Sequence, residues 1–368
     1  MSATAVYPAG RAARDRYVLA RRGPRAAVDP WAPPRVVVEP EPDGLGGIAD
    51  VTTLFLTGRE CPWRCVMCDL WRHTTEGDTP AGAIPQQIRA GLRAGPRAGP
   101  RPGIVRRFLK LYNAGSFFDP RAVPPADDPE IARAVEDFGR VTVESHPRLI
   151  GDRTWRFRDL LARAAGHDRD HGSALEVAMG LETAHPEALA RLNKGCTVDD
   201  FAAAAAALAA HGIGLRVFLL VHPPFVPPEE RTAWLRRSID VALEAGASVI
   251  SLIPTRGDSG AMPALAAQAA FVPPTLADLE TSAALALSSV QSSGQGVQNL
   301  PQIPGRGPAR GPARGPARIL ADLWDLPAFA RCAACLEARR ARLLRQNLTQ
   351  RIPDPEICAA CGAPAACP

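Results

Sequence analysis

The chain has 368 residues, of which 46% are hydrophobic and 22% are charged. This balance permits a full hydrophobic core and excludes a chain that is disordered or collagen-like throughout. The length corresponds to about two typical domains, or to one barrel-sized domain with an appendage. The formal net charge is +5, but only Lys110 and Lys194 among the 43 basic residues are lysines. Such a bias toward arginine indicates coding composition and does not by itself indicate a nucleic-acid partner.

The nine cysteines lie mostly in clusters with CxxC spacing. An odd number in this arrangement indicates metal or cluster ligation in a reducing compartment. Arg11, Arg14, Asp15 and Arg16 interrupt any apolar run near the start, so we expect no secretory signal. The uncharged run Ser259–Ala277 contains three prolines and is not expected to span a membrane. We therefore expect a cytoplasmic protein.

Proline-rich and arginine-rich segments divide the chain. Residues 1–48 predict a leader that at most packs one short helix on the core. Two Arg-Gly-Pro runs, 93–103 and 305–318, contain little to bury and are expected to be solvated loops. The second run fits a linker better than an RNA-binding arm. The predicted division is an N-terminal leader (1–48), a core (49–290), a low-complexity linker (291–318) and a cysteine-rich metal-binding segment (319–368).

Between these segments, short apolar strands alternate with amphipathic helices. The predicted strands are Thr52–Leu56, Phe108–Tyr112, Arg140–Ser145, Leu175–Leu181, Gly214–Val221 and Ser248–Ile253. The predicted helices are Ile84–Leu92, Glu130–Phe138, Trp155–Ala165, Pro186–Leu192, Asp199–Ala210, Glu229–Glu244 and Leu276–Leu287. Repeated strand–helix units call for parallel strands with right-handed crossovers and helices outside. Six such units predict an α/β fold that is either a partial barrel or a doubly wound sheet.

The segment Leu175–Glu182 helps to decide between these folds. Its odd positions are apolar, whereas its even positions are Glu176, Ala178, Gly180 and Glu182. A strand buried between two helix layers would be apolar on both faces. The alternation therefore favours a barrel, with the acidic face directed toward an interior that holds a polar ligand.

Cys61, Cys65 and Cys68 form a CxxxCxxC motif just after the first predicted strand. Three thiolates on one loop can hold three corners of a [4Fe–4S] cluster and leave the fourth iron open to a chelating substrate. The alternatives are a zinc site with a distant fourth ligand, or three incidental thiols.

With this loop, the chain resembles the radical S-adenosylmethionine (SAM) superfamily, in which such a motif follows the first strand of a partial (β/α)6 barrel. The resemblance covers residues 50–290, although Met67 replaces the more usual aromatic residue before the last cysteine. Segments 111–120, 143–151, 180–195 and 217–225 are similar to archaeosine-synthase-type and elongator-type enzymes, which share an Elp3/MiaA/NifB-type core and modify tRNA.

The resemblance implies a reaction as well as a fold. A [4Fe–4S] cluster would reductively cleave SAM to a 5′-deoxyadenosyl radical, which would abstract hydrogen from a substrate. The substrate is unidentified, and the resemblance favours a tRNA base. A flavodoxin-like or ferredoxin-like protein would donate the electron. The implied SAM contacts are Asn113, Gly115, Ser116, Glu144, Glu182 and Lys194. The turn at 113–116 would bind the amino group of SAM, and Lys194 would bind its carboxylate. Glu144 and Glu182 would accept hydrogen bonds from the ribose hydroxyls. An ordinary turn and surface ion pairs are the alternative interpretations.

Several other residues carry weaker signals. His146, His185 and His222 each precede a proline, where a histidine can either cap the turn or donate a proton. Arg216 is expected to point inward beside them. Cys196 could relay a radical, although a lone buried thiol is the commoner case.

The second cysteine set comprises Cys332, Cys335, Cys358 and Cys361, with Cys367 near the end. Two CxxC pairs predict a tetrahedral thiolate site, with zinc favoured over an auxiliary iron–sulfur cluster or unliganded thiols. The arginine-rich helix predicted at Glu337–Leu344 would be the docking surface if the substrate is RNA.

The sequence thus predicts a radical SAM enzyme of unidentified substrate. The first alternative is a non-catalytic zinc- and RNA-binding protein on a barrel scaffold. The second is a radical enzyme that acts on a small molecule.

Overall fold

The protein is described from a computed structural model. The structure describes residues 6–95, 106–165, 174–296, 316–354 and 357–361. Most of both Arg-Gly-Pro runs lies outside the described residues, and so does Cys367.

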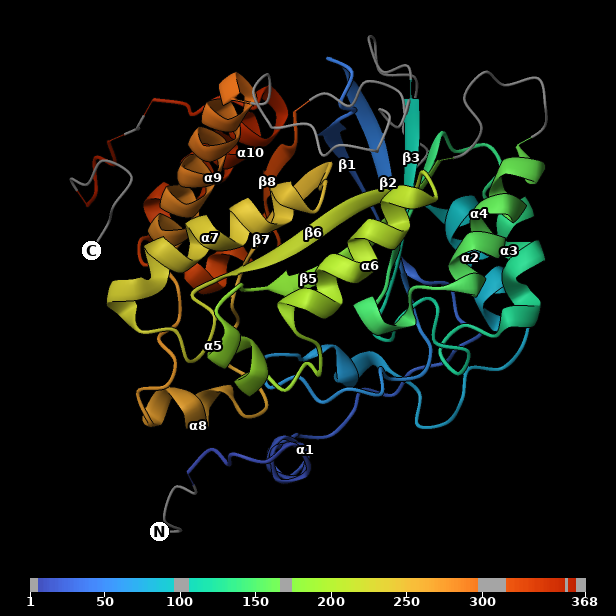
Figure 1. The fold of residues 1–368 in the computed structure, drawn as a ribbon, viewed down its shortest axis with the longest axis horizontal. Helices are drawn as coiled ribbons and strands as arrows, with labels where there is room; N and C mark the ends of the chain where they lie inside the picture. Colours follow the sequence, from blue (N-terminus) through green and yellow to red (C-terminus); the bar gives the residue numbers. More distant parts are fainter. Residues whose placement is uncertain (1–5, 96–105, 166–173, 297–315, 355–356, 362–368) are drawn as a thin grey trace, which may run out of the picture.

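Eight strands form one sheet whose spatial order is the order of the chain. The strands are β1 (Arg35–Pro42), β2 (Ile48–Leu56), β3 (Arg106–Asn113), β4 (Arg140–Glu144), β5 (Ala174–Glu182), β6 (Gly214–Val221), β7 (Val249–Pro254) and β8 (Arg318–Ala321). β1 pairs antiparallel with β2, and every later pair is parallel. The sheet curves into a nearly closed barrel (Figure 1).

The helices lie outside this sheet, and six of them each follow one of the strands β2 to β7. They are α2 (Ala83–Ala94), α3 (Asp128–Ala134), α4 (Asp152–Ala164), α6 (Val198–Ala210), α7 (Arg231–Glu244) and α9 (Leu276–Gly296). The remaining helices are α1 (Arg11–Leu19), α5 (Pro186–Arg191), α8 (Met262–Ala267) and α10 (Leu336–Thr349). The predicted partial (β/α)6 barrel with a cysteine-rich tail is confirmed. No described helix combines the length and the apolar character needed to cross a bilayer.

Local sequence signals explain where these elements begin and end, and α6 shows them most fully. The Thr197 hydroxyl accepts a hydrogen bond from Asp200 N (3.1 Å), and the Asp200 carboxylate accepts one from Thr197 N (2.9 Å). Such a capping box stabilises a helix start by about 1 kcal/mol. An alanine-rich body follows, and Gly212, with φ of +68°, ends the helix in the left-handed region.

The main core lies between the sheet and the outer helices. Its largest fully buried side chains include Phe117, Phe157 and Phe201. A second, smaller apolar cluster lies at the carboxyl end of the parallel strands, which we call the mouth of the barrel. Its members include Tyr7 and Tyr17 from the N-terminal segment and Val66 from the cysteine loop. The leader is therefore packed on the mouth by its own short helix.

Charged side chains fill the opposite end of the barrel interior. The Arg216 guanidinium pairs with Glu176 of β5 (3.1 Å) and with Glu41 of β1 (2.8 Å), and Glu41 also pairs with Lys110. Thr142 donates a further hydrogen bond to Glu176 (3.0 Å). The expectation that the acidic face of β5 holds a ligand is therefore wrong at Glu176, because the protein's own cations satisfy that carboxylate.

Candidate metal and cofactor site at the mouth of the barrel

The cysteine loop follows β2 and is held by segments that are distant in the chain. Val66 N donates to Leu192 O (2.9 Å), and the Asn193 amide donates to Arg64 O (2.9 Å). The Trp63 indole stacks on the His146 ring with centroids 3.5 Å apart and planes 8° apart. The loop is thus fixed from the ends of both β4 and α5.

The three loop thiols are half-buried and suit a cationic group. Burial raises the pKa of Cys61, Cys65 and Cys68 to about 12, so each stays protonated until a positive ion binds. The backbone N–H of Trp63 donates to the sulfur of Cys61, and that of Leu70 to the sulfur of Cys68. Hydrogen bonds of this kind orient and tune cluster ligands. The residues present therefore fit a [4Fe–4S] cluster with three protein ligands.

A buried ion pair lies beside this loop. Lys194 Nζ is 2.9 Å from Glu182 Oε1, and both side chains are buried. Burial alone would lower the pKa of Lys194, but the Glu182 carboxylate raises it above its usual value. A Cβ at Gly180 would overlap Glu182 Oε1, so only glycine leaves room for this pair on β5.

Glu144, at the end of β4, faces the same pair. Burial raises the pKa of Glu144 to about 7, while the nearby charge of Lys194 opposes the rise. This carboxyl therefore titrates near neutral pH, and any hydrogen bond that it accepts from a ligand depends on pH.

The turn after β3 presents an unsatisfied polar group. The Asn113 side chain is 4% exposed, and neither its amide oxygen nor its nitrogen has a hydrogen-bond partner among the described residues. Ser116 Oγ, by contrast, accepts from His146 N (3.1 Å). A Cβ at Gly115 would lie 2.7 Å from Arg59 O and from Ala122 Cβ. This tight turn leaves Asn113 as a buried amide that a polar ligand could satisfy.

The three predicted histidines occupy different positions. His146 is buried, and burial lowers its pKa to about 3. Its Nδ1 accepts from Arg148 N (3.2 Å), so Nε2 carries the proton that is donated to Lys194 O (3.0 Å). His185 caps α5, and His222 lies 3.4 Å from Asp278. Capping therefore accounts for His146 and His185.

The other candidates separate into two groups. Cys196 is buried and lies near Lys194 and Cys65, at the mouth. Lys110 and Arg216 lie at the opposite end, in the charged network around Glu41. Arg216 points inward as expected, but its partners there are Glu41 and Glu176 and not the histidines.

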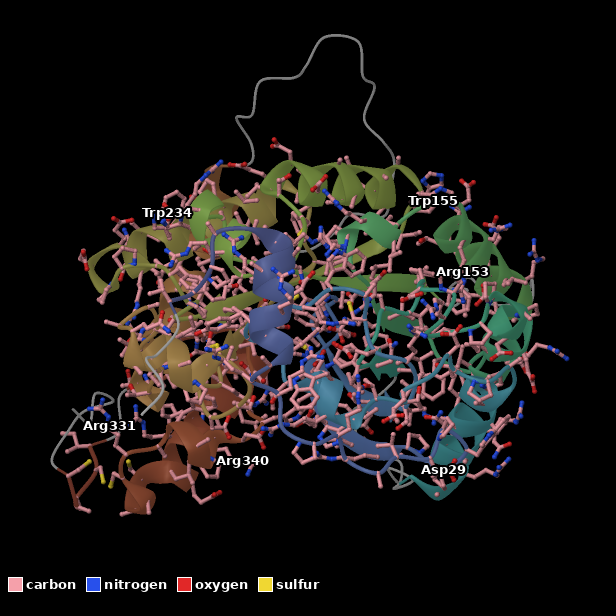
Figure 2. The ribbon with its side chains drawn as sticks, turned by 90° about the horizontal axis from the view of Figure 1, so that it is seen from below. Asp29, Arg153, Trp155, Trp234, Arg331 and Arg340 are labelled. Atoms are coloured by element: carbon pink, nitrogen blue, oxygen red, sulfur yellow. The ribbon has the colours of Figure 1, made fainter. Side chains whose placement is uncertain are left out.

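The N-terminal segment completes the mouth, which the sequence did not predict. Asp15 of α1 accepts from the Asn193 amide (2.7 Å), and both Arg22 and Arg25 pair with Glu60, next to Cys61 (2.7 Å each). Seen from below, α1 lies across the middle of the molecule (Figure 2). Acidic and basic residues in a proline-rich leader carry no periodic signal, so composition alone does not reveal these partners.

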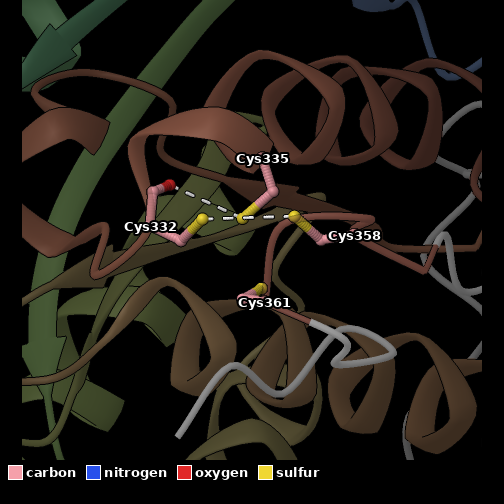
Figure 3. A group of neighbouring side chains, drawn as sticks. All are labelled: Cys332, Cys335, Cys358 and Cys361. Atoms are coloured by element: carbon pink, nitrogen blue, oxygen red, sulfur yellow. Dashed lines mark hydrogen bonds between the residues drawn. The ribbon is translucent and has the colours of Figure 1, made fainter.

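The tail cysteines converge at a separate place. Cys332, Cys335, Cys358 and Cys361 have sulfur atoms that all lie within 4.8 Å of one another (Figure 3). No other group of at least three such ligands in the described part of the chain is this compact.

The helix beside the tail cysteines differs from its prediction. Arg339 and Arg342 of α10 are buried, and both pair with Glu280 of α9 (2.6 and 3.3 Å). They are therefore structural, and among the arginines of this helix only Arg340 and Arg345 are exposed.

Comparison with known proteins gives partial matches. No protein-family profile matches the chain. An uncharacterised protein of Methanocaldococcus jannaschii is 26% identical over 159 residues, which cover 42% of this chain and 41% of that protein. Archaeosine synthase subunit beta of Methanosarcina acetivorans is 28% identical over 138 residues, which cover 36% of this chain and 38% of that protein. The matches thus span about two fifths of these curated relatives.

Among solved structures, coproporphyrinogen III oxidase of Escherichia coli, a radical SAM enzyme, matches with a TM-score of 0.39 and 16% identity. The match covers 78% of this chain and 56% of that chain. Parts of the chain are thus similar to archaeosine synthase subunit beta and, with a TM-score below 0.5, to coproporphyrinogen III oxidase.

Proposed function

We propose that the protein is a radical SAM enzyme whose Cys61, Cys65 and Cys68 bind a [4Fe–4S] cluster. The observation that carries this proposal is the meeting of three half-buried thiols with the unsatisfied amide of Asn113 and the carboxyl of Glu144 at the mouth. Barrel enzymes gather their chemistry at this end. When bound, the cluster and SAM supply an electron and a 5′-deoxyadenosyl radical.

The chain's own residues would bind and orient SAM. Lys194 offers a buried cation for the ligand's carboxylate, and Asn113 offers an amide oxygen for its amino group. Glu182 is held by Lys194 in this structure, so binding of a carboxylate to that lysine frees Glu182 to accept hydroxyl hydrogens beside Glu144. The stacked pair of Trp63 and His146 and the helix α1 would exclude water from the mouth.

As the substrate class we propose a tRNA base. The similarity to archaeosine synthase subunit beta supports this class, and so do the exposed Arg340 and Arg345 on α10. Arg331 and Arg340 extend from the tail region (Figure 2) and could contact phosphates. The reaction also needs a one-electron donor, for which we propose a flavodoxin-like or ferredoxin-like protein in the cytoplasm.

Anaerobic reconstitution of the full chain with iron and sulfide tests the cluster. We expect about four irons at the loop and formation of 5′-deoxyadenosine from SAM under dithionite. The Cys196→Ser variant is the matched control, because it removes a neighbouring buried thiol and leaves the loop intact. Absence of both iron at the loop and 5′-deoxyadenosine from the reconstituted wild-type chain would overturn the proposal.

A binding titration tests the substrate class. Replacing Arg340 and Arg345 by Glu should weaken tRNA binding and reduce its salt slope by about one for each arginine–phosphate pair that is removed. The control is Arg156→Glu, because Arg156 is also exposed but lies on α4 and not on α10. If tRNA does not bind the wild-type chain, or binds equally to both variants, a small-molecule substrate replaces this proposal.

A further inference from the structure

The N-terminal segment reaches the cysteine loop through one carboxylate. Glu60, directly before Cys61, is 8% exposed. It pairs with Arg22 and with Arg25, both at 2.7 Å. Arg64, within the loop, also pairs with Glu60 (3.1 Å) and donates to Cys61 O (2.6 Å). Three guanidiniums around one carboxylate leave an excess of positive charge beside the loop.

The same segment holds the other end of the loop. Arg25 donates to Trp71 O (3.1 Å), and Ala26 N donates to Arg72 O (2.8 Å). Residues 22–26, which we call the bridging segment, therefore contact the chain both before and after the three cysteines. A loop that is held at both ends keeps its ligands in place before any ion binds, as outer-shell partners of metal sites do.

Arg22 differs from the other two arginines at Glu60. Its side chain is 8% exposed, against 30% for Arg25 and 26% for Arg64. The guanidinium lies over the Trp71 ring, with Cζ 4.8 Å from the ring centroid. Its Nε is buried and has no hydrogen-bond partner among the described residues. Because a buried N–H without an acceptor is costly, this atom is a donor left for a group outside the described chain.

The charge of Arg22 also acts on one of the loop thiols. Burial raises the pKa of Cys68, whereas the positive charge of Arg22 opposes that rise. A cation placed there also favours added negative charge on a cluster that the loop binds. Net charge and hydrogen bonds to the sulfurs set the reduction potential of such clusters. Since reduction adds an electron, a nearby guanidinium should favour the reduced cluster and raise its reduction potential.

We propose that Arg22 is a positioning residue of the cysteine loop, and that its guanidinium stabilises the reduced form of a cluster bound by the loop thiols. The bridging segment would then make the N-terminal leader a part of the redox site and not only a cover for the mouth. The effect on the cluster rests on the proposed function, whereas the positioning of the loop can be measured without iron.

A redox titration of the reconstituted chain tests the effect on the cluster. Arg22→Gln removes the positive charge but leaves Glu60 paired with two other arginines. At the wild-type midpoint potential, the ratio of reduced to oxidised cluster, followed by electron paramagnetic resonance, should fall about tenfold in this variant. Arg22→Lys keeps the charge and should stay close to the wild type. The matched control, Arg16→Gln, removes an exposed arginine of α1 and should leave the ratio unchanged.

The two possible failures are distinguishable. Equal ratios in the wild-type chain and in Arg22→Gln, with iron bound at the loop in both, would overturn the effect on the cluster and leave the proposed function intact. A wild-type chain that binds no iron at the loop would overturn the proposed function and, with it, the effect on the cluster.

Hydrogen exchange on the iron-free chain tests the positioning role by itself. Cys68 N donates to Cys65 O (3.2 Å), so this amide reports on the folded loop. Arg22→Gln should speed exchange of the Cys68 amide about tenfold, whereas Arg16→Gln should keep wild-type protection. Unchanged exchange in Arg22→Gln would overturn the positioning role.

Discussion

The loop cysteines and the tail cysteines are the same chemical group in two different environments. The loop supplies three thiols at the mouth, beside a buried ion pair and an unsatisfied amide. The tail brings the sulfur atoms of Cys332, Cys335, Cys358 and Cys361 within 4.8 Å of one another, but Cys361 is bonded in a disulfide. A site with three thiols and polar neighbours leaves a position for a reactant, whereas a sulfur that is held in a disulfide is not a thiolate ligand. The two groups thus differ in how many of their cysteines are free to act as ligands.

The largest expected effect separates the two sites. Cys65→Ser should reduce 5′-deoxyadenosine formation by more than the roughly hundredfold that loss of an outer-shell partner costs, because it removes a direct ligand. A variant that keeps wild-type cleavage would show that the loop does not hold the reactive cluster. The measurements are of 5′-deoxyadenosine and of bound iron, made on the same sample.

The next largest effect is expected at Glu280 of α9, which pairs with Arg339 and Arg342 of α10. Glu280→Ala leaves Arg339 and Arg342 without their carboxylate, which should lower the free energy of unfolding by about 3–5 kcal/mol in urea titrations. Glu337 is exposed on α10, so Glu337→Gln should change the free energy of unfolding by less than about 0.5 kcal/mol. Equal effects of the two substitutions would show that the ion pairs with α9 do not hold the tail.

The edge of β8 should show a smaller effect. Asn347→Ala leaves a backbone N–H and C=O of Ala321 unpaired and should cost about 1–3 kcal/mol. The loss should be measurable by thermal unfolding while cleavage of SAM is retained. A neutral result would mean that water satisfies this edge as well as α10 does.

The smallest expected effect is a pH dependence at the mouth. Glu144 has a folded pKa of about 7, above its unfolded value, because burial disfavours its charged form. The wild-type chain therefore loses stability as pH rises from the unfolded pKa of Glu144 through 7, because the buried carboxyl must then ionise. Glu144→Gln lacks this loss, so its stability relative to the wild-type chain should be higher at pH 8 than at pH 5. If the ionised carboxylate accepts ribose hydroxyls, SAM should bind about tenfold more tightly at pH 8.5 than at pH 6. Calorimetry on Glu144→Gln should show no such dependence.

The sequence predicted all six parallel strands from β2 to β7, because each is a short apolar run between helices of clear period. It did not predict β1 or β8. β1 contains Pro40 and Pro42, which are tolerated there because the strand lies at an edge of the sheet. β8 has four residues and follows the second Arg-Gly-Pro run, so it shows no alternation to detect.

The site was predicted where local spacing carries the chemistry, as in the cysteine motifs. Contacts between distant segments were not predictable in this way. Glu41 neutralises Arg216 and Lys110 from a strand that the sequence did not show. The side-chain amide of Asn193 donates to Arg64 O and so holds the cysteine loop, and the backbone φ of Asn193 is +63°. No local pattern in the sequence predicted this contact.

The attachment of α1 bears on the order in which the protein is made. α1 precedes its partners in the chain, since they include Asn193 and the backbone carbonyl of Ala190, which emerge from the ribosome much later. These contacts of α1 therefore form only after residues 190–193 have been synthesised. Until then the cysteine loop lacks the apolar packing between Val66 and α1 that it has in the finished fold.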